Sequence, residues 1–226
     1  CPQVLESLPL RDFLSGAAEV LKTFMIEDGG HYDAVVKLLF CMQVETVSKA
    51  DNYAAKSWSQ SVACHAAELT DLITAAASVK AGVVSRDQFE KGERRKLNLG
   101  HTFAHAIETL AQQDVPDGGM PVLNLNNEET KVTHGEAVAI GMVMAASLAD
   151  RLSRQNAADG LSAKLKKDFK ACGLPVNCPY SITEMAQAMK KDKKAEGGKV
   201  YFVVPREIGK VEIVDLAVDE VIKLLK

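Results

Sequence analysis

The chain has 226 residues, enough to bury a hydrophobic core and to form one large domain or two small ones. Hydrophobic residues make up 47% of it and charged residues 25%, as in an ordinary globular protein. The formal net charge of -3 gives no basis for binding nucleic acid or an anionic membrane surface, so we expect neither as a partner.

Helical periodicity dominates the first half of the sequence. Apolar residues recur at helical spacing over residues 10–26 and again over 32–47. Residues 54–79 are rich in alanine and leucine and hold few helix breakers, which predicts one long, largely buried helix. A further helix is expected over 101–110.

Residues 112–133 differ in character, because proline, glycine and asparagine are frequent there. They predict a long irregular loop, and a loop of this length in a compact domain is either functional or mobile. Two interpretations stay open: the loop lies over a site, or it projects into solvent.

The last third of the chain returns to helix and then changes to strand. Helices are expected at 134–152, 161–171, 182–191 and 218–225. Two β-branched runs, 200–204 and 210–214, are separated by Pro205 and Gly209 and predict a hairpin. The sequence therefore predicts a mainly α domain spanning residues 1–226, with one small β-hairpin near the C-terminus.

The cysteines and the apolar runs bear on the compartment. The five cysteines are odd in number, and none forms a Cys-x-x-Cys pair, which argues against a disulfide framework or a cysteine zinc site and favours a reducing compartment. The sequence shows neither a run of 18 apolar residues nor a signal-peptide pattern, so we expect no membrane span.

Three histidines and one glutamate are the candidates for a metal site. His101 and His105 stand four residues apart on an expected helix and so project from one face. His134 begins another expected helix, and Glu19 lies on the first one. Two imidazoles and a carboxylate are the donors of a catalytic zinc site. Spacing alone favours His101 and His105 as the ligand pair, although solvated or core histidines give the same pattern.

Cationic residues form a second group of candidates, suited to an anionic ligand because arginine and lysine both pair with carboxylate and phosphate. For the lysine-rich run at 190–194 a solvated helix face is the competing interpretation. The candidates are Lys22, Lys80, Arg94, Arg95, Lys96, Lys190, Lys191, Lys193 and Lys194.

Four motifs, in order along nearly the whole chain, resemble those of the 3-dehydroquinate synthase family. The first is Gly16-Ala17-Ala18-Glu19-Val20-Leu21-Lys22. The second runs from Lys80 through Asp87, Glu90, Gly92 and Arg94 to Leu97-Asn98-Leu99-Gly100-His101-Thr102-Phe103-Ala104-His105-Ala106-Ile107-Glu108. The third is His134-Gly135-Glu136-Ala137-Val138-Ala139-Ile140-Gly141-Met142, and the fourth is Asp192-Lys193-Lys194 with Gly198 and 200–204.

The resemblance implies a role for each matching residue. Glu19, His101 and His134 would bind zinc, or cobalt, and His105 would not be a ligand but would assist proton transfer beside the phosphate. Lys22 would contact substrate hydroxyls near the metal, and Lys22, Asn98 and His105 would be catalytic. Lys80 and Arg94 would hold the substrate carboxylate. The phosphate would be bound by Asn98, His105 and one of Lys193 or Lys194, between which the sequence does not choose.

The resemblance also implies a reaction and partners. The family converts the anionic sugar phosphate 3-deoxy-arabino-heptulosonate 7-phosphate to 3-dehydroquinate and phosphate, a lyase step of the shikimate pathway to aromatic amino acids. NAD is bound there by an N-terminal α/β domain, and this chain shows no glycine-rich loop between a strand and a helix. We therefore expect a piece of a longer chain, inactive alone, that works with its own N-terminal domain as a cytoplasmic or plastid homodimer.

Two alternatives remain beside this interpretation. One is a related sugar-phosphate cyclase with another product, and the other is a non-catalytic metal-binding remnant. Asn98 and His105 favour dehydroquinate as the product, since cyclases for other substrates typically differ at these positions. The complete set of motif residues argues against a remnant.

Overall fold

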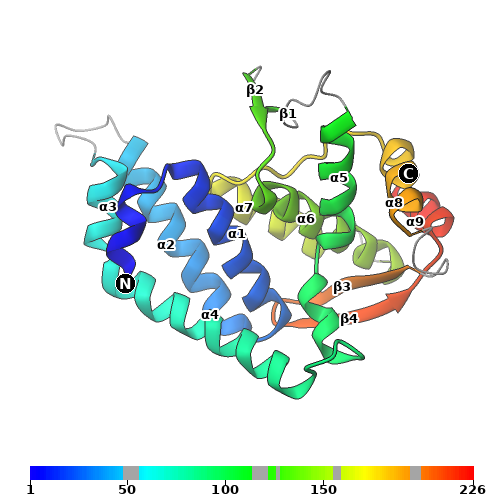
Figure 1. Ribbon diagram of the computed structural model, residues 1–226, viewed down its shortest axis with the longest axis horizontal. Helices are drawn as coiled ribbons and strands as arrows, with labels where there is room; N and C mark the ends of the chain where they lie inside the picture. The colour runs from blue at the N-terminus through cyan, green and yellow to red at the C-terminus, as the bar shows by residue number, and fades with distance from the viewer. Residues whose placement is uncertain (48–55, 114–121, 126–127, 155–158, 194–199) are drawn as a thin grey trace.

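The computed structural model describes residues 1–47, 56–113, 122–125, 128–154, 159–193 and 200–226 (Figure 1). Within these ranges the chain is mainly α-helical, as the sequence predicts. The helices are α1 (Leu10–Ile26), α2 (Gly29–Val47), α3 (Trp58–Cys64), α4 (Ala66–Arg86), α5 (His101–Gln113), α6 (His134–Leu152), α7 (Leu161–Ala171), α8 (Ile182–Lys193) and α9 (Val218–Leu225), with 3-10 helices η1 (Pro2–Ser7) and η2 (Glu93–Asn98).

Helix α6 forms the centre of the core. It packs against α1, α5, α7, α9 and the strand β3 (Tyr201–Glu207), and nearly every residue from Gly135 to Ala149 is buried. A helix that is apolar on all sides has to be enclosed by other elements, and here alanine and glycine let those elements approach closely. Figure 1 shows α1, α2 and α4 on the N-terminal side of α6 and α5, α8 and α9 on the other.

The prediction of one long, largely buried helix over 54–79 is wrong: the segment contains two helices, and most of the second is not buried. Residues 54–55 lie outside the described part, and from Trp58 onward the segment forms α3 and α4, which meet at the non-helical residue His65. Ser57 and Gln60 form a capping box that starts α3. Of α4, only Leu69, Leu72, Ala76 and Val83 are buried. Of the described alanines in this segment only Ala76 is buried; the others are exposed or half-buried, where alanine still favours helix.

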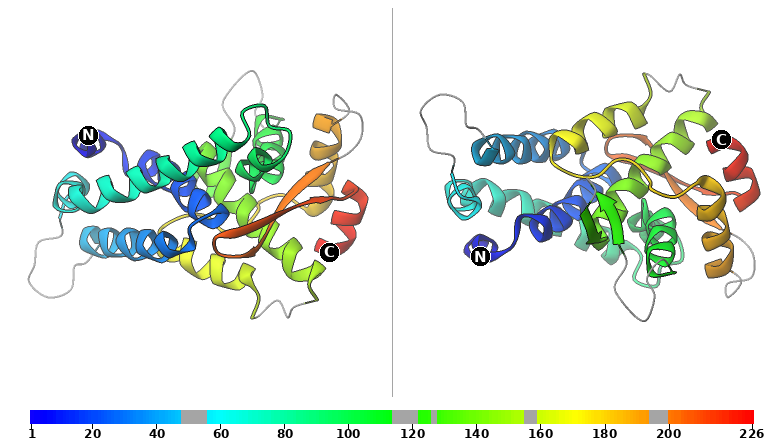
Figure 2. Two further views of the ribbon diagram at one scale, coloured as in Figure 1. Left: turned by 90° about the horizontal axis from the view of Figure 1, so that it is seen from below. Right: turned by 90° about the horizontal axis from the view of Figure 1, so that it is seen from above.

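The predicted C-terminal hairpin is confirmed. Strand β3 pairs antiparallel with β4 (Lys210–Asp215), and the register shifts between Pro205 and Glu207. Proline has no N–H for a ladder hydrogen bond and is tolerated at such an irregularity. The hairpin packs against α6 through β3 and lies in front of α6 in the view from below (Figure 2, left).

The expectation of an irregular loop over 112–133 is wrong in part. Helix α5 continues to Gln113, and the strands β1 (Val122–Leu125) and β2 (Glu128–Lys131) form a second antiparallel hairpin immediately before α6. Residues 114–121 and 126–127 lie outside the described part.

Among the helices that the structure describes, none is both long and apolar enough to cross a membrane.

Candidate metal and anion site

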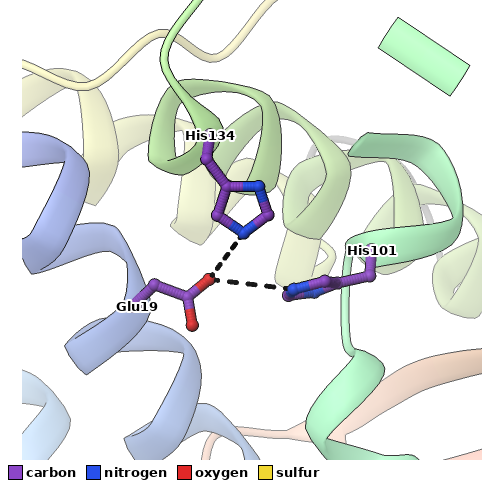
Figure 3. Close-up of side chains that lie close together, drawn as sticks. All are labelled: Glu19, His101 and His134. Carbon is purple, nitrogen blue, oxygen red and sulfur yellow. Dashed lines mark ion pairs between the residues drawn. The ribbon is translucent and has the colours of Figure 1, made fainter. Parts of the chain in front are cut away.

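Three helices bring Glu19, His101 and His134 together (Figure 3). Glu19 lies in the middle of α1, His101 begins α5 and His134 begins α6. Glu19 Oε1 is 3.5 Å from His134 Nε2 and 3.9 Å from His101 Nε2, and the donor atoms of all three residues lie within 4.8 Å of one another. His105 lies outside this group, with its ring edge-on to His101 at 5.6 Å. The geometry thus unites the three residues to which the resemblance gives metal binding.

Two glycines of α6 allow this convergence. A Cβ at Gly135 would lie 2.0 Å from the carbonyl oxygen of Ser15, one turn before Glu19 on α1. A Cβ at Gly141 would lie 2.2 Å from the carbonyl oxygen of Gly100, next to His101. Without side chains at these points, α6 touches the backbones of both α1 and the start of α5. The approach of the three donors therefore depends on the third motif as well as on the donors themselves.

Hydrogen bonds orient both imidazoles. His101 Nδ1 lies 3.3 Å from the carbonyl oxygen of Leu99, and His134 Nδ1 lies 2.9 Å from Glu108 Oε1. Both acceptors require the proton on Nδ1, which leaves the lone pair on Nε2. The two Nε2 atoms are those that face Glu19. Glu108 is part of the second motif, but no role was predicted for it.

Lys22 occupies the other side of the glutamate. Its ammonium donates a 2.6 Å hydrogen bond to Glu19 Oε2, although the residue is only 6% exposed. Burial lowers the pKa of Lys22, and Glu19 only partly offsets this effect. Burial by itself would raise the pKa of Glu19, but the charge and hydrogen bond of Lys22, then His101 and His134, bring it below its ordinary value. Glu19 is therefore a carboxylate at neutral pH.

The site has the chemistry of a divalent cation site. Glu19 Oε1 is buried and has no hydrogen-bond partner within the described part of the chain. Burial, followed by the charge of Lys22, lowers the pKa of His101 to about 4, so this imidazole is neutral at pH 7. A buried, unpartnered carboxylate oxygen beside two imidazole lone pairs fits zinc or a similar ion, which would satisfy all three donors.

A cavity of about 490 Å³ opens next to the three donors. Three of the predicted cations, Lys22, Lys80 and Arg94, line it, so it suits an anionic ligand. His105 is exposed and does not line it, and for Lys193 and Lys194 the side chains lie outside the described part. The lining residues are Glu19, Lys22, Thr23, Lys80, Glu90, Arg94, Leu97, Asn98, His101 and His134.

The segment that carries Arg94 is organised by Asp87. The Asp87 carboxylate accepts backbone N–H bonds from Lys91, Gly92 and Arg94, at 2.8–3.0 Å. These bonds, that of Arg94 first, hold the pKa of Asp87 below its ordinary value. Arg94 Nη1 donates to the carbonyl oxygen of Gln88 at 2.7 Å, which closes the loop on itself.

Glu90 is a cavity residue to which the sequence assigned no function. Its backbone has a φ of 55°, in the left-handed region that residues other than glycine seldom adopt. Asn98 Nδ2 donates to Glu90 Oε1 at 2.9 Å, and Arg95 Nε donates to its carbonyl oxygen at 3.3 Å. A positive φ held by several side chains often marks a functional site. The only sequence signal for a role of Glu90 was its position in the second motif, as an acidic residue among cationic ones.

Fold and site define a class: a helical domain with a two-histidine, one-carboxylate donor set at the edge of a cationic cavity, as metal-assisted enzymes use for anionic substrates. The family described as 3-dehydroquinate synthase C-terminal matches residues 16–195. The chain belongs to this family.

Curated relatives agree. The chain is 34% identical over 217 residues to the 3-dehydroquinate synthase of Picosynechococcus sp., covering 95% of this chain and 50% of that protein. It is 38% identical over 212 residues to the one of Xylella fastidiosa, covering 93% and 46%. The chain thus spans about half the length of the curated relatives it matches.

Solved structures show the same fold at lower identity. 2-Epi-5-epi-valiolone synthase from Streptomyces hygroscopicus, solved with NAD+ and Zn2+, aligns with a TM-score of 0.69 at 21% identity, over 99% of this chain and 52% of that one. 2-Deoxy-scyllo-inosose synthase, solved with carbaglucose-6-phosphate, NAD+ and Co2+, aligns with a TM-score of 0.62 at 18% identity, over 99% and 54%.

Proposed function

We propose that this chain supplies the metal- and substrate-binding half of a 3-dehydroquinate synthase, which converts 3-deoxy-arabino-heptulosonate 7-phosphate to 3-dehydroquinate and phosphate. One observation carries the proposal: the motif residues of three distant segments converge on a donor set with an unpartnered carboxylate oxygen, beside a cavity with three cations. The names of the relatives give the reaction, and this geometry suits its doubly anionic substrate.

In this proposal Glu19, His101 and His134 hold the ion. A zinc or cobalt ion held there would act as a Lewis acid toward a substrate hydroxyl. Lys22, held by Glu19 and almost fully buried, donates a hydrogen bond to the substrate hydroxyls beside the ion. Because burial keeps the pKa of Lys22 below its ordinary value, its proton is held less firmly than that of a surface lysine.

The cations of the cavity bind the carboxylate end of the substrate, and the phosphate end is assigned to residues at and beside the cavity. Lys80 and Arg94 pair with its carboxylate, and the Asp87 loop fixes the direction from which Arg94 reaches the cavity. Asn98 and His105 bind the phosphate, with Lys193 or Lys194, and His105 assists the proton transfer that accompanies phosphate loss. Preorganised charges of this kind stabilise the charge that develops on the leaving group.

The proposal extends to the part of the enzyme that this sequence does not include. NAD would be bound by an N-terminal domain, corresponding to the other half of the relatives' length, so residues 1–226 form one domain that does not turn over alone. A homodimer in the cytoplasm, or in a plastid, belongs to the same proposal. Light scattering of the complete protein tests the dimer.

A fusion tests the function directly. This chain is joined behind the first half of the Picosynechococcus enzyme and assayed for phosphate release from 3-deoxy-arabino-heptulosonate 7-phosphate with NAD. We expect turnover by the fusion, loss of at least about 100-fold in a Lys80→Ala variant whose charge is removed from the cavity, and no change in Lys210→Ala, an exposed lysine on β4. A folded, zinc-loaded fusion that releases phosphate only from another sugar phosphate would replace this substrate assignment.

A further inference from the structure

His134 is the most exposed of the three donor residues. Its side chain is 49% exposed, against 34% for Glu19 and 17% for His101. It is the first residue of α6 and directly follows the segment that contains the β1–β2 hairpin. Packing therefore restrains this ring less than that of His101, and a hydrogen bond on its far nitrogen has correspondingly more influence on its orientation.

Glu108 provides that hydrogen bond. It lies on α5, seven residues after His101, so two turns of one helix carry a metal donor and a partner of another donor. Its Oε1 is 2.9 Å from His134 Nδ1, at the side of the ring opposite Nε2, and its side chain is 28% exposed. Within the described part of the chain, Glu108 lies outside the donor group itself. It therefore acts on the ring and not on the ion.

We propose that Glu108 is a positioning residue, which fixes the tautomer and direction of the His134 ring so that Nε2 faces Glu19. The inference rests on the proposed metal site. A carboxylate on Nδ1 holds the proton on that atom and makes Nε2 a stronger donor, and loss of such partners typically weakens metal binding 10- to 100-fold. The contact also ties His134, at the start of α6, directly to α5.

A competing explanation is purely structural. A carboxylate near the first turn of α6 also interacts favourably with the positive end of that helix dipole, and loss of this interaction would lower the stability of the fold without changing the tautomer of the His134 ring. The two explanations differ in what they predict for the imidazole, because only positioning requires the tautomer of His134 to change when Glu108 is removed.

The test compares three variants of the 226-residue chain. Glu108→Ala removes the acceptor, and Glu108→Gln keeps an acceptor without the charge. Glu68→Ala is the matched control, since Glu68 faces Nδ1 of His65, a histidine outside the donor group, at 3.5 Å. Zinc affinity is measured by competition with a chromophoric chelator. Long-range proton–nitrogen NMR of the metal-free chain reports which ring nitrogen carries the proton, and circular dichroism reports folding.

We expect Glu108→Ala to bind zinc 10- to 100-fold more weakly, Glu108→Gln to fall in between, and Glu68→Ala to stay within twofold of the parent. The His134 ring should hold its proton on Nδ1 in the parent and exchange between both nitrogens in Glu108→Ala. Unchanged affinity and tautomer in folded Glu108→Ala would overturn the positioning role and leave the proposed function standing. A parent chain that keeps the Nδ1 proton but binds no zinc would instead contradict the metal site, and with it the proposed function.

Discussion

Replacing Gly135 with alanine places a methyl carbon 2.0 Å from the Ser15 carbonyl oxygen and 2.5 Å from two further backbone atoms of Ser15. Ordinary contact begins at 3.4 Å, and backbone atoms cannot rotate aside, so α1 and α6 have to separate by roughly 1.4 Å. Overpacking typically costs about 1–3 kcal/mol, and alanine returns up to about 1 kcal/mol of helix propensity. We expect a net loss of about 2 kcal/mol in the free energy of unfolding.

The same substitution acts on the metal site, because His134 precedes Gly135 and Glu19 lies one turn beyond Ser15. The two donors move apart together with their helices. Zinc bonds to nitrogen and oxygen are about 2.0–2.2 Å long and tolerate only about 0.2 Å of change. A separation several times larger should lower zinc affinity by at least about tenfold.

Gly16→Ala provides the control, since it adds the same methyl group to α1 next to Ser15. A Cβ at Gly16 meets no atom within 4 Å, so this variant should be as stable as the parent or up to about 1 kcal/mol more stable. Urea denaturation and zinc titration of both variants measure the two effects. If Gly135→Ala unfolds and binds zinc like Gly16→Ala, the contact between α1 and α6 does not set the donor geometry.

Three further predictions concern other contacts. Glu136, whose side chain is 7% exposed, accepts two hydrogen bonds of 2.6 and 2.7 Å from Arg11, and Arg11→Met removes both. Urea denaturation should show a loss of about 1–3 kcal/mol in the free energy of unfolding, and an unchanged midpoint would contradict this role. Asp87→Ala should speed amide exchange in the loop that this carboxylate closes. In the parent chain the folded state lowers the pKa of Asp87, so its stabilisation of the loop is complete above the ordinary pKa of 3.8 and is lost as the pH falls through the folded pKa. Amide exchange that is equally slow in Asp87→Ala would refute this role. Burial raises the pKa of the Cys172 thiol to about 12, so at pH 8 iodoacetamide should modify exposed Cys64 and leave Cys172 intact until the chain unfolds, which mass spectrometry of the digested chain will show.

Much of the fold follows from local patterns. The bounds predicted for α1, α6, α7 and α9 agree with the structure because amphipathic or continuous apolar periodicity determines them directly. The break at His65 could not be predicted, since no proline or glycine marks it. The β1–β2 hairpin was missed because asparagine and glycine around its short strands are typical of loops. Pairing between strands depends on tertiary contacts, so it could not be predicted from the sequence of these two four-residue segments.

The site follows from the sequence to a different extent. Helical spacing favoured His101 with His105, whereas the donor group combines His101 with Glu19 and His134. Residues on three helices have no common local period, so only the family resemblance could bring them together. The contacts of Glu108 with His134 and of Glu90 with Asn98 depend on tertiary geometry, and neither the spacing nor the motifs revealed them.

The three donors belong to helices that lie far apart along the chain, so a bound ion would also be a covalent-like crosslink between α1, α5 and α6. It would close a loop from Glu19 to His101 and another from His101 to His134, and the chain could not open any one of these helices without losing a ligand. Binding at a free zinc concentration 100 times the dissociation constant would add about 2.7 kcal/mol to the free energy of unfolding. Retention of the ion would consequently report on the integrity of the whole helical assembly, and a chelator would loosen regions far from the cavity.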